Sequence, residues 1–283
     1  MDSPLPLLTP REVFNLPLFE GFFVVSVANE ESFQSLRLVQ SYNCPPSVGD
    51  QHVQDWVQDT IDNYGFETLK TTVVHEHDAT ISPWLQHVAA CITAVASQVA
   101  GAGRHRVYTI EGGATAFFNE YPALCHKGDV LGMEGPTPAH VDTFVFLGSK
   151  LHSEEVDVIS RLGCSNVLNC SQDLPNCFES DNAAVKARYC RLPIVDDSSQ
   201  DMTEAIAVGT EFLRNCCSRG ERVLIHCAEG KSRSATIVIA FLMQQHGWSH
   251  FQALSHVQAA RAIVQPNPGF MRQLATLIPA DPY

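Results

Sequence analysis

Residues 226–234 read His226-Cys-Ala-Glu-Gly-Lys-Ser-Arg-Ser234, and this stretch decides the fold of the second half of the chain. The apolar residues Val223–Ile225 come directly before it, and the longer apolar segment Ala235–Met243 comes directly after it. A short apolar run beside a polar loop is typical of a buried strand, and a longer run is typical of a helix. The sequence therefore predicts a strand, a tight loop that bends at Gly230, and a helix.

The loop between this strand and helix carries residue types that bind an anion. Backbone N–H groups of such a loop point inward, beside the positive end of the helix dipole. The planar guanidinium of Arg233 fits two oxygens of a phosphate, and the same positive field favours the thiolate of Cys227 and lowers its pKa. A thiolate that faces a phosphoryl group is a nucleophile, so the loop predicts a cysteine phosphatase. A cysteine that only packs in the core would explain fewer of these coinciding features.

This loop resembles the phosphate-binding loop of dual-specificity protein phosphatases, and the resemblance covers residues 140–280. The matching segments are, in chain order, Phe146–Ser149, Val167–Ser171, Tyr189–Asp196, Ala240–Met243, Arg261, Pro266–Phe270 and Gln273–Leu274. In the family the first three are strands, the third of which leads into the loop with the general acid, and the others belong to the helices after the phosphate-binding loop. The resemblance implies an α/β catalytic domain with a central mixed sheet flanked by helices.

The resemblance also implies a role for each residue of the loop. Cys227 would attack phosphorus and form a phospho-cysteine intermediate, Arg233 would bind the phosphoryl oxygens, and Ser234 would hydrogen-bond the sulfur. His226 would orient the loop from behind. The phosphate-binding residues would be Ala228, Glu229, Gly230, Lys231, Ser232 and Arg233. The family's mechanism needs no metal and no cofactor.

Asp196 is the predicted general acid, which would protonate the leaving oxygen and then deprotonate the attacking water. It lies 31 residues before Cys227 and seven after Tyr189, which is the usual spacing of the family. Asp197 adjoins Asp196 and stays open as an alternative, because adjacent carboxylates affect each other. Asp201 is better explained as the start of a helix that is predicted to end before Gly220.

Before this domain the sequence alternates between strand and helix patterns. Thr9–Glu12 predicts a capped helix start, and Ser82 opens a helix predicted to run to about Val99. The predicted strands are Phe22–Val27, Thr71–Val74 and Val107–Ile110. Such alternation favours a parallel sheet with helices on its faces. Residues 129–139 hold two glycines and two prolines and predict a linker.

Val107–Cys125 resembles the end of the rhodanese-like domain that precedes the catalytic domain in mitogen-activated-protein-kinase phosphatases. The likeness covers residues 8–128 and implies a rhodanese-like domain there. The loop after Val74 reads His75-Glu-His-Asp78 and has no cysteine, so this domain is predicted to be catalytically inactive. His75 and His77 suggest a metal, but no third and fourth ligands are evident, so a solvated loop explains them better.

Charge restricts the expected partners. The net charge is −13, and residues 1–136 hold 6 Lys or Arg against 16 Asp or Glu, which argues against nucleic acid. Kinase-docking versions of the rhodanese-like domain use an arginine cluster, and residues 1–136 contain no Arg-Arg pair. The architecture therefore predicts a phosphorylated protein substrate, with a mitogen-activated protein kinase as a candidate, although the expected docking residues are missing.

Composition sets the class of protein. A chain of 283 residues with 45% hydrophobic residues can form two domains with buried cores. No apolar run reaches the length of a membrane span, and the N-terminus lacks the features of a secretory signal or a transit peptide. Ten cysteines without regular spacing indicate reduced thiols. We expect a soluble protein of the cytoplasm or the nucleus.

Three functions are compatible with the phosphate-binding loop. No segment before residue 226 resembles the recognition loop of tyrosine-only phosphatases, so a shallow cleft that admits phosphotyrosine, phosphoserine and phosphothreonine is expected. Lys231 lies where some phosphoinositide phosphatases carry a lysine, so a phosphoinositide or another non-protein phosphate is the second candidate substrate. The third function is that of a pseudophosphatase-like regulator, which binds phosphoproteins without turnover. The nucleophile, arginine, hydroxyl and acid are all present, which favours an active enzyme.

Overall fold

The structure is a computed structural model that describes residues 5–16, 22–38, 41–64, 71–97, 105–126, 137–180 and 185–277. The chain divides into two compact units, Met1–Glu134 and Gly135–Tyr283, and each unit has its own five-stranded sheet. Residues 129–136 of the predicted linker lie outside the described ranges, and its last residue, Ala139, begins a strand. The limits of the two predicted domains therefore stay a prediction.

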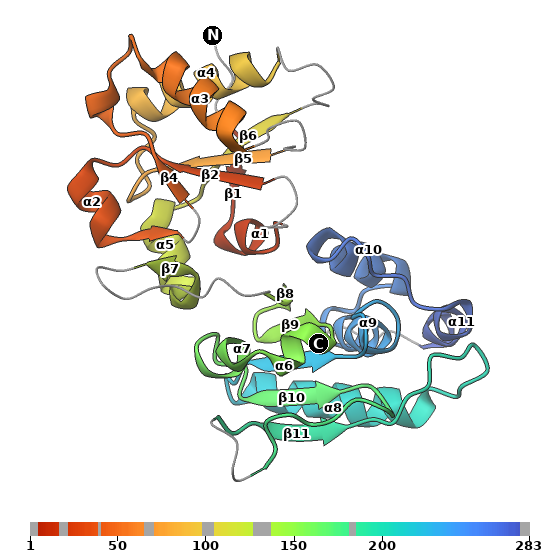
Figure 1. Cartoon of the computed structure of the whole chain (residues 1–283). Helices are drawn as coiled ribbons and strands as arrows, with labels where there is room; N and C mark the ends of the chain where they lie inside the picture. Colours follow the sequence, from red (N-terminus) through yellow and green to blue (C-terminus); the bar gives the residue numbers. More distant parts are fainter. Residues whose placement is uncertain are drawn as a thin grey trace. The chain divides into compact units, whose positions relative to one another are not determined.

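The first unit contains the all-parallel sheet that the βα alternation predicts (Figure 1). Its strand order is β1 (Leu7–Leu8), β6 (Arg106–Ile110), β5 (Thr71–His75), β2 (Phe22–Ser26) and β4 (Ser41–Asn43). A separate antiparallel pair joins β3 (Arg37–Leu38) to β7 (Cys125–His126). The helices are α1 (Pro10–Phe14), α2 (Glu30–Ser35), α3 (Val53–Tyr64), α4 (Pro83–Ala96) and α5 (Gly113–Glu120), with short 3₁₀ turns at Pro46–Val48 and Pro122–Leu124.

Local sequence explains where the helices of this unit begin. Thr9 caps α1 in a capping box with Glu12, as predicted, and Pro10 occupies the first turn. Ser82 caps α4 through a bond from Leu85 N, also as predicted. α4 ends at Ala96 with Ser97 as its C-cap, and the predicted end near Val99 lies outside the described residues. α3 and α4 pack against each other, and their apolar faces form one core with the central strands β2 and β5.

The second unit contains the predicted mixed sheet, with the order β11 (Arg188–Arg191), β10 (Asn166–Asn169), β12 (Val223–His226), β9 (Val145–Gly148) and β8 (Ala139–Asp142). All neighbouring strands are parallel except β8, which pairs antiparallel with β9. The helices are α6 (Lys150–Glu154), α7 (Val156–Ser160), α8 (Thr203–Ser218), α9 (Arg233–His246), α10 (His250–Ala260) and α11 (Pro268–Thr276). The second unit therefore has the α/β fold with a mixed sheet that the sequence predicts.

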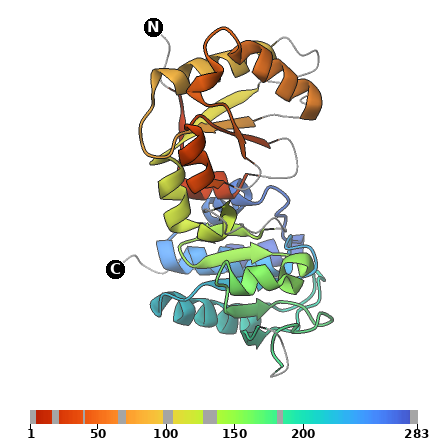
Figure 2. The same ribbon diagram turned by 60° about the vertical axis from the view of Figure 1, so that its left-hand side comes forward.

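The helices of the second unit cover both faces of its sheet (Figures 1 and 2). The connection from β9 to β10 and the connection from β11 to β12 run in opposite directions along the sheet. Right-handed crossovers therefore place α6 and α7 on one face and α8 on the other. α9 packs beside α8, and α10 and α11 pack against α9.

The central strands β9, β10 and β12 are buried along their whole length. Val145–Leu147 and Val223–Ile225 are completely buried, as expected for parallel strands covered on both faces. Ligand sites of such sheets lie at the carboxyl ends of the strands. Gly148, Cys170 and Cys227 come directly at or after those ends, so the sheet brings three distant parts of the chain to one edge.

No helix in the described ranges has the length and apolar character of a membrane span. Among the same residues, no group of three or more His, Cys, Asp or Glu side chains is arranged to hold a metal ion.

The contact between α8 and α9 gives a test of the packing. A Cβ on Gly209 of α8 would lie 2.6 Å from Cγ2 of Ile237, which is completely buried in α9. Gly to Ala in an exposed helix stabilises by about 1 kcal/mol, but overpacking a core costs about 1 to 3 kcal/mol. We predict that Gly209→Ala lowers the free energy of unfolding of the second unit, measured by urea denaturation.

The neighbouring exposed residue supplies the control for this variant. Val208 is 43% exposed, so Val208→Ala should change the same free energy by less than about 0.5 kcal/mol. A stabilised Gly209→Ala protein would contradict the close packing of the two helices.

Candidate active site

The loop Cys227–Arg233, which we call the phosphate loop, leaves β12 and enters α9 at the carboxyl edge of the sheet. Its backbone carbonyls from Ala228 to Ser232 all accept hydrogen bonds from outside the loop. The donors are, in order, Lys150 N (3.0 Å), Arg261 Nη2 (2.8 Å), Arg261 Nε (3.1 Å), Gln265 N (2.9 Å), and Thr236 N (2.9 Å) together with its Oγ1 (2.8 Å). Because the carbonyls point outward, the N–H groups of the loop are left to face its concave side, where an anion can accept from them.

Two residues fix the shape of this loop. The guanidinium of Arg261 binds the carbonyls of Glu229 and Gly230 together, which only a planar side chain with several donors can do. Gly230 has φ +68°, and a Cβ there would lie 2.3 Å from the carbonyl oxygen of Gly148. The loop therefore approaches strand β9 backbone to backbone, and only glycine fits at the bend.

Cys227 is buried at the bottom of the loop, with 2% of its surface exposed. Burial by itself raises the pKa of its thiol, but the net effect is a pKa below the ordinary value. The groups that outweigh burial are the Ser234 hydroxyl, which donates to Sγ at 3.2 Å, the Ser234 N–H, the charge of Arg233 and the Gly230 N–H. Donors and a positive charge stabilise the thiolate more than the lost water destabilises it.

The side chain of Arg233 is 13% exposed and lies along the floor of the site. Its Nη1 donates to the Ser171 hydroxyl at 3.2 Å and lies 3.5 Å from the carbonyl of Ile194. Its Nε is buried without a hydrogen-bond partner among the described residues. The guanidinium is thus held by the segments that follow β10 and β11, and it keeps a donor for an anion.

Asp196 is the acidic residue that the structure brings to the phosphate loop. Its Oδ1 accepts from the Ser232 hydroxyl at 2.7 Å and from Asn267 Nδ2 at 2.8 Å. Its Oδ2 lies 3.9 Å from Arg233 Nε, and the side chain is 40% exposed. The carboxyl group therefore has one oxygen bound to protein donors and the other directed toward the arginine side of the site.

The two alternative acids lie elsewhere. Asp197 accepts from the N–H and hydroxyl of Ser199, and these bonds lower its pKa and fix it in a turn. Asp201 makes the same two bonds with Thr203, the first residue of α8, so it supports the helix start from two residues outside the helix. Neither carboxylate has a contact with the phosphate loop in the described part of the chain, whereas Asp196 does.

These residues line a cleft of about 440 Å³. The residues that line it are Asp196, Cys227, Glu229, Lys231, Ser232, Arg233 and the segment from Gln265 to Pro268. Glu229 and Lys231 bring opposite charges to its rim. The cleft thus joins a buried thiol, a mostly buried arginine and a partly exposed carboxyl group.

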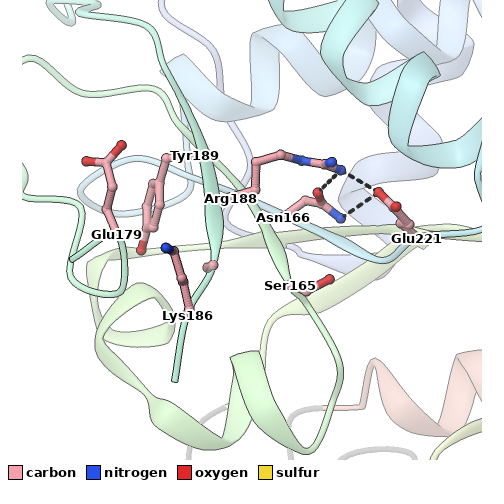
Figure 3. A pocket seen from close by; sticks show the side chains of 8 residues that line it. Ser165, Asn166, Glu179, Lys186, Arg188, Tyr189 and Glu221 are labelled. Carbon is pink, nitrogen blue, oxygen red and sulfur yellow. Dashed lines mark hydrogen bonds and ion pairs between the residues drawn. The ribbon is translucent and has the colours of Figure 1, made fainter. Parts of the chain in front are cut away.

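A second cleft of about 600 Å³ lies beside the edge strand β11 and is shown in Figure 3. Arg188 in this cleft binds both Glu221 and Asn166, so its charge is compensated by a carboxylate. The residues that line it are Ser165, Asn166, Glu179, Lys186, Ala187, Arg188, Tyr189 and Glu221. None of them is a cysteine and none belongs to the phosphate loop, so the larger cleft lacks the groups for the predicted chemistry.

His226 lies behind the loop, completely buried, and neither of its ring nitrogens has a hydrogen-bond partner among the described residues. Burial lowers its pKa to about 4. His152, which accepts from Ser149 N at 2.9 Å, has its pKa lowered to about 4 in the same way. Both rings are neutral at pH 7, which fits the prediction that His226 shapes the loop and does not carry a proton.

The structure also shows residues whose contribution the sequence did not reveal. Ser171 positions Arg233, Arg261 holds two loop carbonyls, and Asn267 contacts Asp196. In the sequence, the segments that contain these residues show only a resemblance to the family pattern. One signal for Asn267 was present in the sequence. An Asn directly before a Pro is typical of a helix start, and the side chain of such an N-cap residue lies outside the helix.

The nine other cysteines differ from Cys227. All are free, and the pKa of each is raised, chiefly by burial; Cys44, Cys125 and Cys164, for example, have pKa values of about 12. The others with raised values are Cys91, Cys170, Cys177, Cys190, Cys216 and Cys217. Cys227 is the one cysteine whose surroundings favour the thiolate.

The model of one protein family matches this part of the chain: dual specificity phosphatase, catalytic domain, over residues 145–277. The second unit is a dual specificity phosphatase catalytic domain. The match includes Cys227, Arg233 and Asp196 and ends at the last described residue of the chain.

Curated relatives agree with this assignment of the dual specificity phosphatase domain. Protein phosphatase Slingshot homolog 3 of Rattus norvegicus is 36% identical over 132 residues, which cover 47% of this chain and 20% of that protein. Dual specificity protein phosphatase 4 is 32% identical over 196 residues in Gallus gallus and 31% identical over 198 residues in Homo sapiens. These alignments cover 60% and 61% of this chain and 50% and 49% of the relatives. The chain thus spans half or less of the length of these relatives.

The all-parallel sheet of the first unit fits the rhodanese-like resemblance. His75 ends β5, and the carbonyls of Glu76 and His77 in the following loop accept from the N–H groups of Ala114 and Thr115 at the start of α5. The loop has no cysteine, in line with the prediction of an inactive domain. That inactivity stays a prediction.

The hydrogen bond from Ser234 to the sulfur predicts a change in thiol acidity. A hydrogen bond to a charged group contributes about 1.5 to 3 kcal/mol, and one pH unit corresponds to about 1.4 kcal/mol. In Ser234→Ala, the pKa of Cys227 should therefore rise, and the pH at which iodoacetate alkylation reaches half its maximal rate should rise by about one unit or more. Ser218→Ala, at an exposed position in α8, is the control and should leave the profile unchanged. An unchanged profile in Ser234→Ala would contradict the stabilising role of this hydroxyl.

Proposed function

We propose that the chain is a protein phosphatase that hydrolyses phosphotyrosine and phosphoserine or phosphothreonine through a phospho-cysteine intermediate. The observation that carries the proposal is the position of Cys227 in a loop whose carbonyls from Ala228 to Ser232 all accept hydrogen bonds from outside the loop. Arg233 at the end of this loop lies 3.9 Å from Asp196, and the two residues line one cleft with Cys227. The dual specificity phosphatase domain and the named relatives support it.

In the first step, the Cys227 thiolate attacks phosphorus as the bond from phosphorus to the leaving oxygen breaks. The inward N–H groups of the phosphate loop and the Arg233 guanidinium stabilise the charge on the equatorial oxygens. Asp196, in its acid form, gives its proton to the leaving oxygen, which departs as a hydroxyl group. The products of this step are the dephosphorylated side chain and a phosphorus–sulfur bond.

In the second step, water attacks the phospho-cysteine and Asp196, now a carboxylate, takes the proton of that water. The phosphorus–sulfur bond breaks and the thiolate returns. The Ser234 hydroxyl, 3.2 Å from Sγ, stabilises the departing sulfur. Inorganic phosphate is released and Asp196 is again the acid. The neutral His226 takes no part in these proton transfers.

Charge in the cleft favours a phosphoprotein over a phosphoinositide. A phosphoinositide headgroup carries several phosphates, whereas the residues that line the cleft include two cations, Lys231 and Arg233, and two acids, Glu229 and Asp196. Ala228 stands where a second lysine would extend the positive rim. A phosphorylated side chain brings one phosphate to one arginine and is the better match.

Cys227→Ser tests the chemistry. We expect this variant to lose hydrolysis of para-nitrophenyl phosphate and to keep phosphate binding, because the loop N–H groups and Arg233 remain. Turnover is measured by absorbance. Binding is measured as the stabilisation of the folded protein against unfolding when vanadate or phosphate is added. Comparable hydrolysis by the variant would refute the phosphatase mechanism, and a wild-type chain that binds phosphopeptides without turnover would support the pseudophosphatase alternative.

Asp196→Ala tests the acid. We expect kcat to fall by about 100-fold or more for a phosphoserine peptide, since a positioned proton donor contributes about 10² to 10⁴ in rate. Asp197→Ala is the matched control, because this neighbour bonds Ser199 and not the phosphate loop. If only the Asp197 variant lost activity, the acid would be misassigned.

The physiological target is proposed from the sequence alone. A mitogen-activated protein kinase is the candidate, and the test is to capture phosphoproteins with the Cys227→Ser protein as bait and to identify the bound phosphosites. Kinases phosphorylated in the activation loop are the expected capture. Capture of lipid phosphates without phosphoproteins would favour a phosphoinositide or another non-protein phosphate as the substrate.

A further inference from the structure

We propose that Asn267 is a positioning residue for the proton transfer: it holds Asp196 so that Oδ2 carries the proton toward the leaving oxygen. The assignment rests on the proposed function. It follows from a network that joins the start of α11, the phosphate loop and the segment of the general acid.

The orientation of the Asn267 amide is fixed by its own helix. Asn267 is the N-cap of α11, and its Oδ1 accepts from Phe270 N at 3.0 Å. A backbone N–H can only donate, so the oxygen of the amide must face Phe270. Nδ2 must then face away from the helix, and it donates to Asp196 Oδ1 at 2.8 Å.

The direction of the Ser232 hydroxyl is fixed in the same way. Its Oγ accepts from the backbone N–H of Asn267 at 3.1 Å, and it lies 2.7 Å from Asp196 Oδ1. The hydroxyl therefore directs its proton to Asp196. Asn267 thus acts on the acid twice, once through its own amide and once by orienting Ser232.

Two donors on one oxygen decide which oxygen of Asp196 is protonated. Oδ1 already accepts from the Asn267 amide and from the Ser232 hydroxyl. A proton on Oδ1 would face these two donors and break at least one of the hydrogen bonds, which is unfavourable in a partly buried site. The acid form therefore carries its proton on Oδ2. This oxygen lies 3.9 Å from Arg233 Nε, on the side where the phosphoryl group and its leaving oxygen would be bound.

The backbone of the segment Asp196–Met202, which we call the acid segment, is held by α11 as well. A Cβ on Gly269 would lie 1.9 Å from the carbonyl oxygen of Ser198, so the segment lies directly against the first turn of α11. Gln273 accepts from Met202 N and donates to the carbonyl of Gln200, both at 2.8 Å. Among the described contacts of α11, only that of Asn267 reaches the carboxyl group itself, so Asn267 sets the orientation of the group while the others set the path of the chain.

The test uses substrates that differ in their need for a proton. Asn267→Ser keeps a good N-cap for α11 but is too short to reach Asp196. For a phosphoserine peptide or phenyl phosphate, whose leaving oxygen needs a proton, we expect kcat to fall by about 10-fold or more; for para-nitrophenyl phosphate the fall should be less than about threefold. KM should stay the same for all three, because the phosphate loop is unchanged.

Asn267→Asp supplies a second variant with the helix cap retained. Its carboxylate would stand opposite the carboxyl group of Asp196, so the loss with the phosphoserine peptide should be at least as large as in Asn267→Ser. Ser249→Ala is the matched control, because it removes the N-cap of α10, which has no contact with Asp196 among the described residues. Its kcat ratio between substrates should equal that of the wild type.

A double variant separates positioning from a general structural effect. Once Asp196 is replaced by alanine, there is no proton to position, so adding Asn267→Ser to Asp196→Ala should lower kcat by less than about twofold further. An equal loss for all substrates in Asn267→Ser, or full additivity in the double variant, would overturn the assignment while the wild type still turned over. A wild-type chain that hydrolyses none of the substrates would overturn the proposed function and this assignment with it.

Discussion

The second unit depends on the outward hydrogen bonds of the carbonyls of Ala228–Ser232. A free loop of this length would turn some of its carbonyl dipoles toward the sulfur and would repel both a thiolate and a phosphate. Here α6, α9, α10 and their connections supply a donor for each carbonyl, and Arg261 supplies two of them. The positive lining of the site is therefore built by contacts outside the site, with few cations inside it.

The same constraint explains how a buried sulfur can be acidic. Burial raises the pKa of each of the other nine thiols, and it acts on Cys227 in the same direction. Cys227 differs because fixed N–H and O–H donors and one guanidinium face it, and their combined effect exceeds that of burial. A nucleophile shielded from water but matched by fixed dipoles needs little reorganisation when its charge moves to phosphorus.

Sequence reasoning predicted the parts of this site that are contiguous. One short stretch of sequence, from the phosphate loop into the first turn of α9, contains Cys227, Gly230, Arg233 and Ser234. Its residue types and spacing therefore predict one site, and the apolar runs on either side predict the strand and the helix. Asp196 was predicted as the general acid from a family spacing, and this role stays a prediction. The structure adds that Asp196 contacts the phosphate loop and that Asp197 contacts Ser199, a difference that two adjacent carboxylates do not show in the sequence. Ser171, Arg261 and Asn267 act across 30 or more residues of chain, and no local pattern encodes such contacts. The narrow spaces at Gly209 and Gly269 are equally invisible before the helices are packed.

The anchoring of the acid segment to α11 has a consequence for the time course of turnover. Many enzymes close a mobile lid over the substrate before chemistry, and the opening and closing of that lid then limits their rate. Here the segment from Asp196 to Met202 is already bound to α11 at Gly269 and Gln273, and the loop below it is bound at every carbonyl from 228 to 232. The phosphate loop and the segment that carries Asp196 therefore hold their positions without a bound substrate, so the proposed mechanism needs no lid to close over the site.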